Sequence, residues 1–321
     1  EGKNRASLSN QSDFSWTLDN LIYYDKEIGK HSFGLTLLQS ATGYHYEESS
    51  MAAEGIPLES AKWNALSKEN VSLLDEWNSG LIEKQLLSYM FRVNYDYNNK
   101  YLLTVSGRWD GASQLAEGNK WAFFPSAALG WRLDQEEFLK DVTWLNQLKF
   151  RLGVGVTGNS AIDPYQTKGA IVSLYYPFGA TLAPGYAASE PLIKDGAVAM
   201  ANKDLSWEKT TQYNIGLDYS VLNGRISGVL DFYTSRTTDL LMAMTIPSLN
   251  GYTNTYANVG KTSNIGVDIT LNTVNIKTRD FEWSTSINAA WQKDKIDELA
   301  NGKEDDINNN WFIGQALGVI Y

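Results

Sequence analysis

The sequence has 321 residues, a net charge of −10, no Cys, 11 Trp and 18 Tyr. The acidic balance excludes a nucleic-acid binder, which needs clustered Lys and Arg, and the lack of Cys excludes disulfides, zinc–thiolate sites and thiol catalysis. No run of 18 apolar residues is present, so a transmembrane helix is excluded and a soluble β protein or a membrane β-barrel is left.

Strand-like alternation of apolar and polar residues begins near the N-terminus. It predicts a strand over residues 14–24, a turn at Ile28-Gly29-Lys30 and a second strand that starts near Phe33. A long loop is expected over residues 41–80, and its second half favours a helix because Glu, Lys, Leu and Ala dominate it. A third strand follows and ends at the turn of residues 98–100.

The middle of the chain predicts three more strands. They cover residues 101–110, 121–133 and 147–156, and Asp134 to Glu137 resembles a capping box that opens one helical turn. A second long loop is expected over residues 158–206.

The stretch from Trp207 to Leu241 predicts a hairpin with two long arms. Odd positions such as Ile215 are mostly apolar and even positions such as Asp218 are polar, which indicates a strand with two unlike faces. Asn223-Gly224 predicts a two-residue type I′ turn between the arms. A third long loop, residues 242–258, and two further strands near 265–271 and 281–291 complete the chain.

About ten strands result, and their connections alternate between short and long. In an up-and-down antiparallel sheet this order collects the tight turns at one end and the long loops at the other, as in outer-membrane barrels. A strand of about 14 residues spans roughly 46 Å, or about 35 Å across the membrane when tilted by about 40°. The fold class is therefore an all-β, antiparallel up-and-down transmembrane β-barrel segment.

Aromatic residues near the expected strand ends are consistent with the two rims of such a barrel, although they could instead cap the core of a soluble sandwich. They are Tyr97, Trp109, Trp121, Trp131, Trp144, Trp207 and Trp283.

Motifs that might carry chemistry are few. His45 precedes Glu47 and Glu48, but neighbours in sequence seldom converge on one metal ion, so a polar loop is favoured over a metal site. His31 is expected to meet solvent. The G-x-G-x-x-G pattern of residues 153–158 lies in a strand and not before a helix, so a dinucleotide site is not favoured. We expect no catalytic, cofactor-binding or metal site, and no enzyme activity.

Four arginines form the candidate site. Arg92, Arg108, Arg132 and Arg151 fall on the polar face of four successive strands, which in a barrel is the face of the lumen. They would point at whatever fills the lumen. The alternative is that they pair with carboxylates of the same face, such as Asp96, Asp110 and Asp134.

Several blocks of the sequence together resemble the barrel of SusC/RagA-type TonB-dependent transporters. They are residues 101–104, 108–113, 123–132, 148–151, 157–159, 204–208, 216–219, 231–233, 239–241, 258–260, 266–268 and 313–321. The similarity covers residues 83–321 well and the first eighty less distinctively.

The resemblance implies a 22-stranded outer-membrane barrel with an N-terminal plug and a SusD-like surface lipoprotein. It implies import of oligosaccharides or peptides with energy from the TonB complex, and contact with membrane lipid. No plug or TonB box is found in the sequence, so residues 1–321 are expected to be a C-terminal barrel portion of a longer protein. The substrate and the residues that bind it are not indicated. The alternative function is a soluble extracellular β-sandwich or adhesin that binds a partner through its loops.

Overall fold

The computed structural model describes residues 4–56, 59–66, 73–168, 172–178, 181–187, 199–247 and 254–317. They form a ten-stranded sheet in the order β1-β2-β3-β4-β5-β6-β10-β11-β14-β15, a three-stranded sheet β12-β13-β9 and a two-stranded sheet β7-β8. The ten strands follow one another in chain order, and every pairing from β4 to β15 is antiparallel. The predicted up-and-down sheet of about ten strands is confirmed.

The strands of the large sheet are β1 (Arg5–Ile28), β2 (His31–Glu54), β3 (Leu73–Tyr97), β4 (Tyr101–Ala112), β5 (Trp121–Arg132), β6 (Leu145–Asn159), β10 (Glu208–Val221), β11 (Ile226–Thr238), β14 (Lys261–Lys277) and β15 (Glu282–Glu298). The other strands are β7 (Val172–Phe178), β8 (Thr181–Ala187), β9 (Ala199–Met200), β12 (Leu241–Thr245) and β13 (Asn254–Asn258). Short 3₁₀ turns occupy η1 (Glu59–Ala65), η2 (Leu133–Gln135), η3 (Glu137–Leu139) and η5 (Ile307–Asn309). No helix in the described part of the chain is long and apolar enough to cross a membrane.

The chain divides into two compact units. The first comprises residues 1–19 and 40–87, so it holds parts of β1, β2 and β3 together with η1. Within it, the backbone N–H of Gly55 donates to the carbonyl of Asn4 at 2.9 Å, and the indole of Trp16 covers Gly43, where a Cβ would come within 2.3 Å of Nε1.

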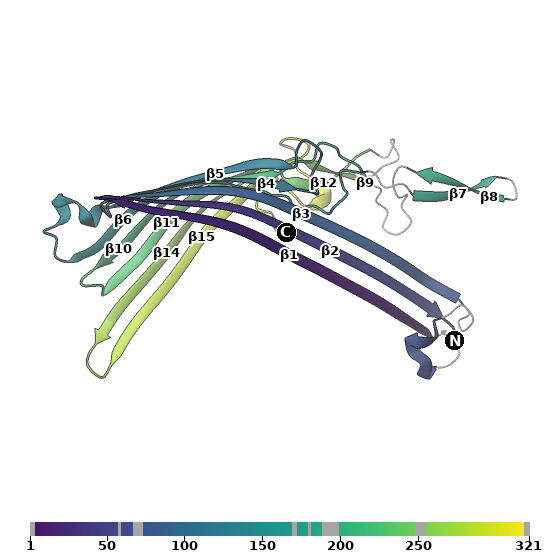
Figure 1. Ribbon diagram of the computed structural model, residues 1–321, viewed down its shortest axis with the longest axis horizontal. Helices are drawn as coiled ribbons and strands as arrows, with labels where there is room; N and C mark the ends of the chain where they lie inside the picture. Colours follow the sequence, from purple (N-terminus) through teal and green to yellow (C-terminus); the bar gives the residue numbers. More distant parts are fainter. Residues whose placement is uncertain are drawn as a thin grey trace. The chain divides into compact units, whose positions relative to one another are not determined.

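The second unit comprises residues 20–39 and 88–321. Figure 1 shows that its connections β5–β6, β10–β11 and β14–β15 lie at one end of the strands, while β9 and β12 lie at the other. We call these the turn end and the loop end. The small sheet of β9, β12 and β13 therefore belongs to the loop end.

The large sheet leaves its apolar face open. On β10 the side chains of Tyr213 and Ile215 are 57% and 47% exposed, and on β11 Phe232, which pairs with Ile215, is also exposed. A soluble sandwich would bury such a face under a second sheet. The exposed apolar face therefore does not support the sandwich alternative.

The predicted long loops are only partly loops. The expected loop 41–80 is wrong at both ends, because β2 continues to Glu54 and β3 begins at Leu73, with η1 in place of the expected helix. Residues 158–206 contain the hairpin β7–β8 and strand β9, and residues 242–258 contain β12 and β13. Among the described residues, β7 pairs with β8, and β9, β12 and β13 form a separate small sheet. Each of these strands has seven residues or fewer, so its alternation reads as loop in the sequence.

Three local predictions were also wrong. Asn223-Gly224 is not a two-residue turn: Val221 pairs with Ile226, and Leu222, Asn223 and Gly224 all have positive φ in a four-residue connection. Asp134 caps no helix and instead accepts from the backbone N–H of Leu148 at 3.2 Å. The connection of residues 133–144 is longer than that of 113–120, so the alternation of short and long connections is broken there.

Trp207 is not a rim residue. Its side chain is 5% exposed, its ring meets Phe124 edge-on at 5.2 Å between centroids, and its Nε1 donates to the carbonyl of Lys120 at 2.8 Å. Buried Leu115 and Leu205 belong to the same loop end, where the N–H of Ala116 donates to the carbonyl of Leu205. The loop end thus has a small core of its own.

Candidate functional site on the polar face of the sheet

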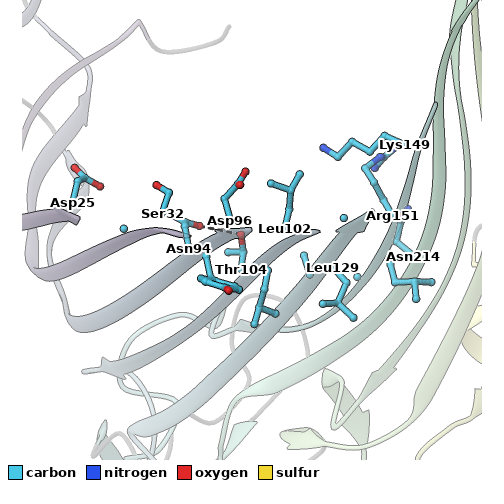
Figure 2. A pocket seen from close by; sticks show the side chains of 17 residues that line it. Asp25, Ser32, Asn94, Asp96, Leu102, Thr104, Leu129, Lys149, Arg151 and Asn214 are labelled. Atoms are coloured by element: carbon cyan, nitrogen blue, oxygen red, sulfur yellow. Dashed lines mark hydrogen bonds between the residues drawn. The ribbon is translucent and has the colours of Figure 1, made fainter. Parts of the chain in front are cut away.

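A trough of about 450 Å³ lies on the sheet of the second unit. Asp25, Asp96 and Lys149 project from one side of the sheet along it (Figure 2). Small residues, among them Gly34 and Gly153, form its floor. The trough has carboxylates at its β1 and β3 side and cations at its β6 side, so it can hold a polar segment that carries both signs of charge.

Arg151 holds three strands together at the cationic side of the trough. Its Nε donates to Oδ1 of Asp218 on β10 at 2.9 Å, and its Nη2 donates to both oxygens of Asp231 on β11 at 3.0 Å. Gly216 lies between Arg151 and Asp231 in the pairing, and a Cβ there would come within 2.6 Å of the guanidinium carbon. A glycine is therefore needed for the guanidinium to cross β10.

Arg108 is held within its own strand and by β3. Its Nε donates to Asp110 at 2.7 Å, and its Nη2 donates to the hydroxyl of Ser88 at 2.9 Å. Asp110 and Ser88 are both buried. The expected alternative, a pairing with Asp110 in the sheet itself, is confirmed.

Arg132 is paired in the same way at the turn end. Its Nη2 donates to Asp134 at 2.8 Å, as the alternative predicted. Burial of the Asp134 carboxyl raises its pKa, but the hydrogen bonds from Arg132, Gln135 and the N–H of Leu148 outweigh this, so its pKa lies below the ordinary value. Arg132 Nε is buried without a partner among the described residues.

Arg92 differs from the other three arginines. It is exposed on β3, and within the described ranges it makes no ion pair or hydrogen bond. Lys149, on β6 opposite Asp218, also lacks an ion pair there. Arg92 and Lys149 can therefore still bind a charged group without breaking an ion pair among the described residues.

The two histidines are not at the trough. In the first unit His45 contacts Glu47 through Nε2 at 3.0 Å and Glu83 through Nδ1 at 3.1 Å, while Glu48 accepts from Tyr46. The carboxylates meet opposite ring nitrogens, so they do not converge on one ion, and no group of three or more potential metal ligands occurs in the described part of the chain. His45 lies on strand β2, so the expected polar loop is wrong there.

His31 is exposed as expected, but it also contacts the hydroxyl of Tyr95 at 2.8 Å. The glycines of residues 153–158 lie in β6, and Gly153 pairs with Asn214 and Ala128 on the trough floor. The strand context that argued against a dinucleotide site is confirmed.

The sequence did not reveal Asp218, Asp231 and Lys149 as members of the site. All three fall on the polar face, but the partners of Arg151 depend on which strands are neighbours and in which register. The sequence feature that could have indicated this arrangement is Gly216. A glycine on the polar face of a strand leaves room for a long side chain from the neighbouring strand to pass over it.

A family model matches residues 2–318 of the chain: "TonB dependent receptor-like, beta-barrel". Among curated proteins, the TonB-dependent receptor SusC of Bacteroides thetaiotaomicron is 35% identical over 311 residues, which are 92% of this chain and 28% of SusC. A TonB-dependent receptor of Formosa agariphila is 34% identical over 303 residues, 93% of this chain and 29% of that protein. The chain thus spans less than a third of the length of these relatives.

Solved structures show the same arrangement of strands. The RagAB peptide importer in its open-open state matches 97% of this chain and 33% of that chain, with a TM-score of 0.85 and 26% identity. Another RagAB peptide transporter structure gives a TM-score of 0.83 at 25% identity, with 97% of this chain and 34% of that chain covered.

Proposed function

The chain belongs to the TonB-dependent receptor-like β-barrel family, and we propose that it forms part of the wall of an importer that takes up oligosaccharides or peptides. It is a segment of an outer-membrane β-barrel. We propose that the whole barrel has 22 strands and an N-terminal plug and is formed by a longer protein. Residues 1–321 would be one C-terminal part of that barrel. The relatives it matches are named as receptors and transporters, and we assign this chain transport and no catalysis.

The observation that carries the proposal is the two-faced sheet. Apolar side chains such as Ile215 stand exposed on one face, where lipid would cover them. The other face has the ion pairs of Arg108 and Arg151 and the trough, as expected of a hydrated lumen. A wall of this kind separates lipid from a polar passage.

The substrate classes and partners are proposed from the family and its relatives. Peptides follow the RagAB peptide importer, and oligosaccharides are the other class that the resemblance to SusC/RagA-type transporters implies. We propose a SusD-like lipoprotein as a surface partner and the TonB complex as the source of energy. The lipoprotein would approach the loop end, where the connections carry the additional strands β9, β12 and β13.

The four arginines were expected to face a plug. Arg108, Arg132 and Arg151 already have carboxylate partners, so we assign them to the stability of the wall. We propose that Arg92, together with Lys149, meets the carboxylates of a plug or of a passing substrate. Both are on the polar face and neither has an ion pair within the described residues.

Blocking the polar face tests the import proposal. Asn214 lines the trough, and Ile215, its neighbour on β10, is on the opposite face. Since the sequence has no Cys, Asn214→Cys and Ile215→Cys can each be modified with one bulky maleimide. Uptake of a panel of fluorescent oligosaccharides and peptides is measured in energised cells and in cells treated with an uncoupler.

We expect energy-dependent uptake of at least one probe, strongly reduced by modification of Asn214→Cys and unchanged by modification of Ile215→Cys. Equal inhibition at both positions, or no probe whose uptake depends on the protein, would contradict the proposal.

A further inference from the structure

The exposed apolar face has a groove beside one row of aromatic residues. It has a volume of about 620 Å³ and is lined by Ile22, Leu37, Phe91, Trp109 and Phe123 with two amides, Asn20 and Gln39. We call it the amide groove. We propose that it binds one glycerophospholipid in a defined position, with an acyl chain among the apolar residues and an ester group at the two amides.

The aromatic residues place the groove at the level of the lipid headgroups. Tyr89 stacks on Trp121 at 6.2 Å, and at the turn end Tyr97 stacks on Tyr101 at 6.3 Å. Eight residues of β3 separate Tyr89 from Tyr97, about 26 Å along the strand and roughly 20 Å across a membrane at a tilt of about 40°. The two aromatic pairs therefore lie near the two edges of an apolar band about 25 Å thick. Tyr89 and Trp109 line the amide groove, so the groove begins at the girdle of the loop end.

The two amides supply a recognition element that a purely apolar surface lacks. Asn20 Nδ2 donates to Gln39 Oε1 at 2.6 Å, which leaves the Asn20 Oδ1 acceptor and the Gln39 Nε2 donor without a partner in the part of the chain that the structure describes. Of these two groups, Gln39 Nε2 is the one that can donate to an ester carbonyl. An unpaired amide facing lipid is unfavourable because no water is present to bind it. The ester carbonyls of a glycerophospholipid lie at this depth and accept hydrogen bonds.

The chemistry of the lining favours a phospholipid over lipid A. Lipid A carries phosphates, which proteins bind with Lys and Arg. The residues that line the groove include neither. The free Gln39 Nε2 donor matches the carbonyl of an uncharged ester, and the apolar residues beyond it match one acyl chain.

A second groove on the same face provides a matched control. Its volume is about 630 Å³, and it lies at the turn end among Tyr101, Leu103, Trp131 and Leu152 without an Asn or Gln. If any exposed apolar groove retained lipid equally, the two grooves would behave alike. If the amides matter, only the first retains it.

The test uses the complete protein purified from its native membrane. Residues 1–321 contain no Cys, and any Cys elsewhere in the complete protein is replaced by Ser. A bimane fluorophore can then be attached at Leu37→Cys in the amide groove or at Leu152→Cys in the control groove. Brominated phosphatidylethanolamine quenches the fluorophore on contact, and its mole fraction is raised in stepwise titrations. Both labels are repeated in the double variant Asn20→Leu/Gln39→Leu.

We expect half-quenching at Leu37→Cys at a mole fraction about threefold lower than at Leu152→Cys, the effect of about one hydrogen bond, and equal values in the double variant. Equal values in the unaltered protein, or a difference that persists in the double variant, would overturn the proposal. So would recovery of fluorescence at Leu37→Cys when unbrominated lipid A is added.

Misfolding of the double variant is separated from loss of the site by a second measurement. A phosphatidylethanolamine with a diazirine in its acyl chain is photolysed with the unaltered protein, and the adducts are mapped by mass spectrometry. We expect enrichment in the peptides that carry Leu37 and Phe91. Adducts spread evenly over the apolar face would overturn the proposal.

Discussion

Arg151 on β6 donates from Nη2 to both carboxylate oxygens of Asp231 on β11, at 3.0 Å each, although strand β10 lies between them. The same guanidinium also binds Asp218 on β10. Three successive strands of the barrel wall are thus joined by one side chain, which pairs with two carboxylates and leaves the cluster with a net charge of −1.

Removal of Arg151 should destabilise the wall. Arg151→Ala leaves Asp231 without its cation and Asp218 with only Lys149 opposite it. Since the Arg151 side chain is only 29% exposed, we expect a loss of about 1–3 kcal/mol in the free energy of unfolding. Arg92→Ala is the control, because Arg92 is exposed and unpaired among the described residues, and it should change stability by less than about 0.5 kcal/mol. Urea unfolding in lipid vesicles measures both, and equal losses would contradict the assignment.

A methyl group at Gly216 should have a similar effect. Gly216→Ala would put a Cβ within 2.6 Å of the guanidinium and force Arg151 away from Asp231, with a loss of about 1–2 kcal/mol. Gly153→Ala is the matched control on the same face, because its Cβ would meet only the Cβ of Asn214 at 3.9 Å. That change should be neutral or stabilising by about 0.4–1 kcal/mol. If both substitutions change the free energy of unfolding equally, the absence of a side chain at Gly216 is not what allows Arg151 to reach Asp231.

Trp207 should be more important to stability than the tryptophans of the rim. Trp207→Phe removes the hydrogen bond to the carbonyl of Lys120 and loosens a 5% exposed ring, so we expect a loss of about 1–3 kcal/mol. Trp283→Phe, at a ring that is 53% exposed, should stay within about 0.5 kcal/mol. Unfolding followed by tryptophan fluorescence compares them, and the reverse order would disprove the packed loop end.

Glu136 should make stability depend on pH in an acidic window. Its carboxylate accepts from Trp131, Tyr101 and Lys100 at 3.0, 2.7 and 3.0 Å, and these hydrogen bonds lower its pKa from the ordinary 4.5 to about 2. The pKa is depressed in the folded state, so the contribution of Glu136 is complete above about pH 4.5. It is lost as the pH falls from there to about 2.

The variant Glu136→Gln should remove that part of the pH dependence and lower stability at neutral pH. Glu137→Gln is the control, because Glu137 pairs only with Lys140 three residues later, on the surface. Unfolding midpoints measured between pH 2 and pH 7 separate the two. An acid limb that is the same in Glu136→Gln and the unaltered protein would refute the role of this cluster.

Labelling from outside cells should distinguish the two ends of the strands. Glu117 is exposed in the connection of residues 113–120 at the loop end, and Asp280 is exposed in the turn between β14 and β15. A membrane-impermeant maleimide should label Glu117→Cys in intact cells and Asp280→Cys only after lysis. Equal labelling in intact cells would contradict the topology.

The loops show where sequence reasoning was limited. Alternation identified the strands that have one face in lipid, because apolar residues recur there at every second position over a long stretch. Beyond the membrane band this constraint disappears, so the outer parts of β2 and β3 read as loop although their backbones continue to pair. The short strands β9, β12 and β13 were missed for the same reason.

The sequence by itself determined the fold class, the ten strands of the large sheet, the two faces and the turn at residues 98–100, because these follow from a period of two residues and from local turn chemistry. Tertiary structure alone decided which carboxylates Arg151 binds, how Trp207 is buried and where Glu136 collects its three donors. Each of these depends on contacts between segments that are separated in the sequence. The partners of Arg151 depend in addition on the register of β6, β10 and β11, where a shift of one residue would turn the same side chains to the opposite face.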